Sequence, residues 1–433
     1  MSSLVFRKPL SVTWIWVCAG AVHLLLWVSL RTGWLCPLFN DTMHRFGPGA
    51  DFFALYQAGY NARHGVSIYS FETGFTVIPY AYPFRYLPAS AYFGILLTAV
   101  SPPLAYALWI GFCELCLLYN VRLTFMRTGG GIRGARLASL WLVFSPFFIE
   151  LWIGQFTFLL SSLLFWCTLA EEEGKSKRAL GWWIASVLWK PASLLWVPIW
   201  LRERRYLPGL ALCAVLLACN GAYFLLFPGD WPVFLKTNVD PTPTWHAGNL
   251  GLSGLIYQFT GKGPDFRIWR LGLHAALVIP ALWVTLGRNR KAIPFWLLGG
   301  LWTSLYFLVY KDVWEHHMML LLPFLILALW RSPSYLLMGI FVLLALPSPF
   351  VLYDLRYLAL NVDPQPYFTR EVSIIHHSWR VVPILVLYGH WLRQAARLKA
   401  PESGDVTSSP ACDADMKRSP GGSLASESQL HAG

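Results

Sequence analysis

The sequence predicts an all-α polytopic membrane protein, on the evidence of its composition, its apolar runs and the placement of its charges. Of its 433 residues, 56% are hydrophobic and 13% are charged, whereas soluble domains carry about 25% charged residues. The net charge of +12 comes from basic residues clustered in short loops between apolar runs. That distribution is typical of loops that face anionic lipid, and it argues against a nucleic-acid partner.

The apolar runs predict about 10–13 transmembrane helices. Two runs are interrupted, 87–121 by Ser101-Pro102-Pro103 and 180–200 by Lys190-Pro191, so each is either two short helices or one kinked passage. The first run follows Arg7 and Lys8 and has no small-residue cleavage site, which is typical of an uncleaved signal anchor. The runs cover residues 12–30, 87–121, 137–150, 155–170, 180–200, 207–227, 268–287, 293–310, 317–331, 334–352 and 379–396.

Charge predicts the orientation of these helices. Short basic loops follow several runs, and by the positive-inside rule they face the cytoplasm. The long segments 31–86, 228–266 and 353–378 then face outward. This map closes only if 87–121 crosses a net odd number of times and 180–200 a net even number. The second condition predicts a hairpin turning at Lys190-Pro191. The basic residues concerned are Arg122, Arg127, Arg133, Arg136, Lys175, Lys177, Arg178, Arg202, Arg204, Arg205, Arg288, Arg290, Lys291, Arg393, Arg397 and Lys399.

The chain divides into one multi-span membrane domain, residues 1–400, and a tail, residues 401–433. The tail is rich in Ser, Gly, Asp and Pro, so we expect it to be disordered and cytoplasmic. Most of the eight cysteines lie in apolar runs, and Cys113-x-x-Cys116 has no second pair. We therefore expect no disulfide framework, no metal site and no cofactor, and we expect Cys113 and Cys116 to be buried, inert thiols in a spanning helix.

The first outer loop contains the residue of most interest, Asp51. Pro48 and Gly49 favour a helix start there, and apolar residues then recur at helical spacing. The segment is too short and too polar to span a bilayer, which predicts an amphipathic helix along its surface. Asp51 would lie just above the membrane as a functional carboxylate, or would simply occupy the first turn, where the helix dipole favours acids. The spaced residues are Phe52, Leu55, Tyr56 and Gly59.

Further polar groups gather on the same predicted outer face, where polar side chains near a membrane are candidates for function. They lie in 81–88, at Gly154-Gln155 after Glu150, in 245–253, and in 311–317. His316 and His317 are either interfacial residues at the end of a span or part of a site. Lys190 either extends to the cytoplasmic interface or contributes to that site.

The order and spacing of these elements resemble glycosyltransferase family 87, within the membrane-embedded glycosyltransferase-C superfamily. The resemblance covers about residues 45–330. It rests on Asp51-Phe52-x-x-x-Tyr56-x-Ala58-Gly59, Gly65-x-x-x-Tyr69, Tyr82-Pro83, Gly154-Gln155, Lys190-Pro191, Gly248-Asn249 with Ser253, and His316-His317 before Pro323. The sequence departs from the family where Phe84-Arg85 follows Tyr82-Pro83, and where Lys311-Asp312 precedes the histidines.

The resemblance implies a glycosyltransferase-C-like fold in the cell (inner) membrane, with an extracytoplasmic active site. It implies transfer of a hexose, mannose above all, from a polyprenyl-phosphate-sugar donor to a lipid or glycan acceptor. By the resemblance, Asp51 matches the family's catalytic acid, and the two histidines match residues near the donor phosphate.

General chemistry agrees with this reading, because a sugar phosphate brings its own leaving group. One carboxylate can deprotonate the acceptor hydroxyl, and cations can stabilise the departing phosphate. We expect Asp51 to be the base, and His316, His317, Arg85 and Lys311 to bind the phosphate. The predicted substrate-binding residues are Tyr56, Tyr82, Gln155, Lys190, Trp245, Asn249 and Ser253.

The alternative class is a transporter or flippase of lipid-linked glycans. A transporter is expected to place paired charges and broken helices near the membrane midplane in both halves of the chain. Here the polar residues gather at one predicted face, with Lys190 as the main exception. That placement favours the enzyme.

Overall fold

The computed structural model describes residues 11–32, 47–70, 76–79, 83–202, 206–238, 248–261, 263–287, 293–347 and 368–398, and within these ranges its regular elements are all helices. The tail, Tyr82 and Trp245 lie outside the described residues. The first half contains α1 (Val12–Thr32), α3 (Ala50–Arg63), α4 (Pro88–Leu97), α5 (Pro102–Arg127), α6 (Gly131–Ser139), α7 (Pro146–Ile153), α8 (Thr157–Glu172), α9 (Ser176–Trp189), η2 (Pro191–Trp196) and α10 (Val197–Leu201). The second half contains α11 (Tyr206–Leu216), the π-helix η3 (Leu217–Gly221), α12 (Ala222–Leu226), α13 (Asp230–Asn238), α14 (Leu252–Thr260), α15 (Pro264–Leu286), α16 (Phe295–Val309), η5 (Glu315–Leu320), α17 (Leu322–Arg331), α18 (Tyr335–Ala345) and α20 (Arg370–Arg397).

Four helical segments in the described part are long and apolar enough to cross a membrane: α1, α5, the continuous stretch α11–η3–α12, and α15. They carry exposed apolar side chains, among them Leu115, Leu225 and Trp283, as expected for surfaces that face lipid. Several other predicted runs are divided into shorter helices. The run 137–150, for example, falls into α6 and α7, with Pro146 opening the second. The larger count of 10–13 spans stays a prediction.

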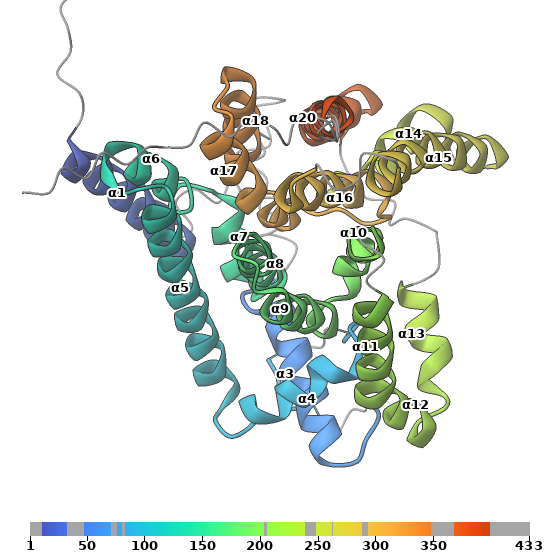
Figure 1. The fold of residues 1–433 in the computed structure, drawn as a ribbon. Helices are drawn as coiled ribbons and strands as arrows, with labels where there is room; N and C mark the ends of the chain where they lie inside the picture. Colours follow the sequence, from blue (N-terminus) through green and yellow to red (C-terminus); the bar gives the residue numbers. More distant parts are fainter. Residues whose placement is uncertain are drawn as a thin grey trace, which may run out of the picture.

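The centre of the fold is formed by α8 and α16, which are buried along most of their length. Twelve of the 16 residues of α8 and 13 of the 15 of α16 are buried. Figure 1 shows α8 and α16 in the middle of the molecule, with α5 along one side and α11 to α13 along another. Helices that are apolar all round are found in a protein core or in a membrane, and these two lie in the core of the fold.

The run 87–121 is two helices, as its Ser-Pro-Pro break allows. The first helix, α4, has ten residues, about 15 Å in length, which is too short to cross a bilayer. It packs against α3 (Figure 1). At the crossing, a Cβ on Gly59 would lie 2.1 Å from the carbonyl carbon of Gly94. The two backbones can approach this closely only because both positions are glycine.

The expected hairpin at Lys190-Pro191 is confirmed. A contact between its two arms shows that the chain reverses there: Trp183 of α9 donates its indole N–H to the Ser193 carbonyl oxygen at 3.0 Å. Its ring also lies 5.3 Å from that of Trp200, near the end of α10. Both arms of the hairpin therefore lie side by side, and the Lys-Pro pair forms its tip.

The helix predicted after Pro48-Gly49 is present as α3, but ten of its 14 residues are buried. The aromatic ring of Phe52 packs against Tyr106 and Trp109 of α5, and Gly59 contacts α4. Because these helices enclose it, α3 lies inside the fold, and the structure does not confirm an amphipathic helix along a membrane surface.

Candidate active site

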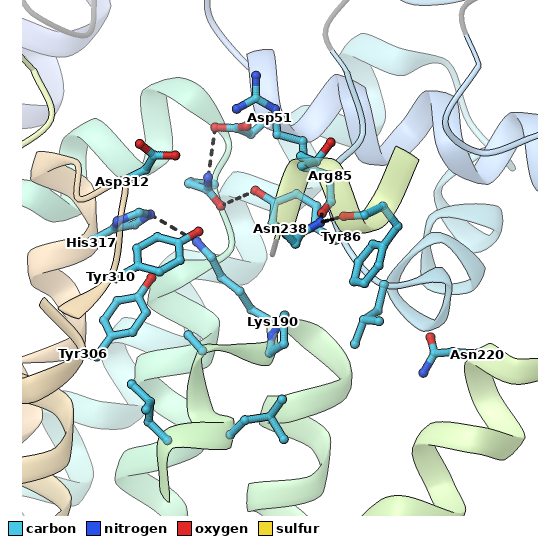
Figure 2. Close-up of a pocket in the computed structure, with 18 of the residues that line it drawn as sticks. Asp51, Arg85, Tyr86, Lys190, Asn220, Asn238, Tyr306, Tyr310, Asp312 and His317 are labelled. Atoms are coloured by element: carbon cyan, nitrogen blue, oxygen red, sulfur yellow. Dashed lines mark hydrogen bonds between the residues drawn. The ribbon is translucent and has the colours of Figure 1, made fainter. Parts of the chain in front are cut away.

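A cavity of about 890 Å³ lies between the start of α3, the hairpin tip, α11 to α13 and the segment from α16 to η5. Figure 2 shows its polar side: Asp51 and Arg85 on one wall, Tyr306, Tyr310 and His317 on another, and Lys190 extending between them. Its lining residues include Asp51, Arg85, Tyr86, Gln155, Lys190, Asn220, Asn238, Tyr306, Tyr310, Asp312, Trp314, His316 and His317. The cavity thus brings together segments from six parts of the chain.

Six of the residues predicted from the sequence line this one cavity. They are Asp51, Arg85, Gln155, Lys190, His316 and His317. They come from positions as far apart as 51 and 317, and only the fold brings them together.

Four other predicted residues do not line the cavity. Tyr56 follows Asp51 by five residues, which on a helix turns its side chain by about 140° away from that of Asp51. Its hydroxyl donates to the Val100 carbonyl oxygen at 2.8 Å. Lys311 donates to the Thr237 carbonyl oxygen at 2.9 Å. Asn249 and Ser253 are fully buried. Asn249 donates to the Lys311 carbonyl oxygen at 2.7 Å and thereby supports the loop before η5.

Asp51 is held by a short hydrogen-bonded chain. Gln155 donates its side-chain N–H to Oδ2 of Asp51 at 3.1 Å, and its amide oxygen accepts from the Tyr86 hydroxyl at 3.0 Å (Figure 2). The same oxygen accepts the backbone N–H of Phe156 at 2.8 Å. Asp51 is therefore positioned by side-chain contacts, which a residue that only caps a helix start does not need.

The backbone sets the distance between Asp51 and Gln155. The Gly49 N–H donates to the Trp152 carbonyl oxygen at 2.7 Å, which joins the start of α3 to the end of α7. Gly154 adopts φ +65°, and a Cβ there would lie 2.5 Å from the Cβ of Phe52. Gly154 thus allows both the turn and the close approach.

Burial makes the carboxylate of Asp51 more basic than that of an exposed aspartate. It raises the pKa of Asp51 from 3.8 to about 6, and the nearby charges of Lys190 and Arg85 and the hydrogen bond from Gln155 oppose that rise. A carboxylate with such a pKa is ionised at neutral pH and is still basic enough to accept a proton from a hydroxyl as that hydroxyl reacts.

Lys190 points into the cavity from the hairpin tip and does not extend to a surface. Its backbone is extended at φ −151° and ψ 121°, between the end of α9 and Pro191. It is 8% exposed, and its Nζ donates to Oγ1 of Thr157 at 3.0 Å. Nζ also lies 3.3 Å from Nε2 of His317 (Figure 2).

The hydrogen bonds of His317 determine which of its ring nitrogens carries the proton. The backbone N–H of Trp314 donates to its Nδ1 at 3.2 Å. A backbone N–H only donates, so Nδ1 is the acceptor, and in a neutral imidazole the proton is then on Nε2. Nε2–H and a protonated Lys190 are two donors that meet at the cavity wall. Such a pair suits an anionic acceptor.

The two adjacent histidines lie on a short 3₁₀-helix that is anchored from behind. Their rings are 4.4 Å apart and inclined by 72°, and it is His317 whose Nε2 lies 3.3 Å from Nζ of Lys190. Arg380 of α20 is fully buried and forms an ion pair with Glu315; it also donates to the Leu346 carbonyl oxygen at 2.6 Å. This anchor was not predicted, because the two partners are 65 residues apart and no local pattern connects the segment 311–317 to Arg380.

Sequence reasoning also missed the aromatic wall of the cavity. The rings of Tyr306 and Tyr310 are stacked 4.8 Å apart at 21°, and each meets His317 nearly edge-on. Two tyrosines four residues apart at the end of an apolar run, just before Lys311-Asp312, were the available signal. They face the same direction on a helix.

The other side of the cavity is apolar. Leu194 of the hairpin and Leu217 of η3 line it, together with Leu216, Phe224 and Phe234. Leu194 is 39% exposed and Leu217 is 71% exposed, so this side of the cavity presents accessible apolar surface.

No protein-family model matches the chain, and no curated protein matches it at a significant level. Among the described residues, no group of three or more His, Cys, Asp or Glu side chains is arranged to hold a metal ion.

Proposed function

We propose that the protein is an integral-membrane, inverting glycosyltransferase. It would move a hexose, mannose by the resemblance of its motifs, from a polyprenyl-phosphate-sugar donor to a hydroxyl of a lipid or glycan acceptor on the extracytoplasmic face. The observation that carries the proposal is the placement of Asp51, as a candidate base, in the same cavity as the paired donors of Lys190 and His317.

The proposed reaction uses these groups on opposite sides of the sugar. The acceptor oxygen attacks the anomeric carbon and forms a new C–O bond, and its proton passes to the carboxylate of Asp51. The bond between the anomeric carbon and the phosphate oxygen breaks, and its electron pair leaves with that oxygen. The phosphodiester of the donor becomes a phosphomonoester with one additional negative charge.

That additional charge is what the enzyme has to stabilise in the transition state. The ammonium of Lys190 and Nε2–H of His317 are two donors held by the protein before the substrate binds, and Arg85 lines the same cavity. Arginine suits phosphate because it can donate two parallel hydrogen bonds. These groups support a phosphate leaving group without a metal ion in the proposed scheme.

The apolar side of the cavity supports a lipid-borne substrate. A hydrocarbon chain attached to the phosphate can lie against Leu194, Leu217 and Phe224. A soluble nucleotide sugar would place the polar groups of its nucleotide against these apolar side chains, and burying polar groups without hydrogen-bond partners is unfavourable.

The experiment incubates the purified protein in lipid vesicles with a panel of polyprenyl-phosphate sugars and membrane lipid acceptors. Mass spectrometry then looks for an acceptor heavier by one hexose and for free polyprenyl phosphate in equal amount. The matched control is Asp51→Asn, and a nucleotide sugar serves as the negative donor. Movement of the donor across the bilayer without formation of a new glycosidic bond would instead identify a flippase.

A further inference from the structure

We infer that Gln155 and Tyr86 are positioning residues for Asp51: they fix its carboxylate toward the cavity and favour its ionised form. The catalytic consequence rests on the proposed function, but the structural statement does not. Sequence analysis predicted Gln155 to bind substrate. Its contacts instead assign it the role of holding Asp51 in position.

The orientation of the Gln155 amide is determined by its neighbours. The oxygen and nitrogen of an amide look alike, but the backbone N–H of Phe156 can only donate. The atom that faces it at 2.8 Å is therefore the oxygen, and the NH₂ group must face Asp51. An N–H directed at a carboxylate stabilises the ionised form and lowers its pKa.

Tyr86 strengthens this arrangement from behind. Its hydroxyl donates to the same Gln155 oxygen at 3.0 Å. A donor on the oxygen polarises the amide and makes its N–H a better donor toward Asp51. The ring of Tyr86 packs edge-on against that of Phe156, with the ring centres 5.3 Å apart. This packing holds the hydroxyl within hydrogen-bond distance of the Gln155 oxygen.

The Gln155 turn and the first turn of α3 form one unit. The bond from Gly49 N–H to the Trp152 carbonyl oxygen and the contact of Gly154 with Phe52 join them directly. The charged groups that face Asp51 are Lys190 of the hairpin and Arg85 before α4, and Glu150 of α7 is a further buried carboxyl near it. The two cations favour the ionised form of Asp51, and Gln155 adds a neutral donor beside them.

The test measures the protonation of Asp51 directly, in the full-length protein in vesicles. A hydrophobic carbodiimide modifies protonated carboxyls, and mass spectrometry of the peptide containing Asp51 gives the extent of modification at each pH. The variants are Gln155→Leu, which removes the donor, and Tyr86→Phe, which removes the hydroxyl and keeps the ring. Tyr106→Phe is the matched control, because its hydroxyl supports the same turn through the Leu151 and Trp152 carbonyl oxygens without contacting Asp51.

We expect the midpoint of modification to move to higher pH by about one unit in Gln155→Leu and by less in Tyr86→Phe. Tyr106→Phe should leave it unchanged. Equal midpoints in the wild type and both test variants would overturn the inference, as would an equal shift in the control. If the midpoints move as expected and the vesicles show no hexose transfer, the positioning role stands and the proposed function fails.

Discussion

Nζ of Lys190 lies 3.3 Å from Nε2 of His317, although 127 residues separate them. One comes from the tip of a hairpin and the other from a 3₁₀-helix anchored by Arg380. Both atoms are donors when the lysine is protonated and His317 accepts from the Trp314 N–H. Two donors that face one wall of a cavity, with a carboxylate on another wall, form a site suited to an anion and a reacting hydroxyl.

The first prediction concerns this donor pair. His317→Ala should lower hexose transfer by a factor of about 10 or more, because stabilisation of the leaving phosphate is lost. His316→Ala should have a much smaller effect, since it is His317 whose Nε2 lies close to Nζ of Lys190. Initial rates at saturating donor and acceptor measure both. If the two variants keep full activity, the histidines are interfacial residues and the phosphate site is elsewhere.

The second prediction concerns Asp51. Asp51→Asn keeps the size of the side chain and removes its basicity, so transfer should fall by roughly 10²–10⁴-fold in the catalytic step rather than in donor binding. A residue that only begins a helix would respond differently, because Asn is nearly as good as Asp there. The rate at saturating substrates distinguishes the two. A rate near wild type would remove Asp51 from the mechanism.

The third prediction is a pH dependence. The pKa of Asp51 is raised to about 6, so the base is lost by protonation below that pH. Transfer should therefore increase with pH through a midpoint near 6 and fall about tenfold per unit on the acid side. The measurement is kcat/KM at a series of pH values from about two units below that midpoint to about two units above it. A flat profile would mean that a different group takes the proton.

The fourth prediction is the topology. Cysteine at Thr76 should be labelled in intact cells by a membrane-impermeant reagent, on a background lacking Cys36, and cysteine at Lys177 should not. Both positions are exposed, so access depends on the side of the membrane. The expectation follows from the basic-loop asymmetry. The reverse pattern would place the cavity's polar side toward the cytoplasm.

The structure confirms several features that local sequence signals determine. The break at Ser101-Pro102-Pro103, the turn at Lys190-Pro191 and the helix after Gly49 depend on proline and glycine, which act within a few residues of their own position. The helical class follows from the apolar runs. Local signals do not determine the number of spanning helices, or whether α3 lies along a membrane surface or inside the fold. Both depend on which helices pack against one another.

The sequence by itself identified Asp51, Arg85, Gln155, Lys190, His316 and His317 as chemically distinctive, because charged and polar side chains stand out against apolar surroundings. Only the tertiary structure decided that these six share one cavity, that Tyr56 and Lys311 do not line it, and that Gln155 contacts Asp51. No local pattern assigns partners to Tyr86 of the segment 81–88 or to Arg380 of the run 379–396; their partners lie 69 and 65 residues away. Such contacts arise when packing of the whole chain brings distant segments together, and no pattern of spacing along the sequence encodes them.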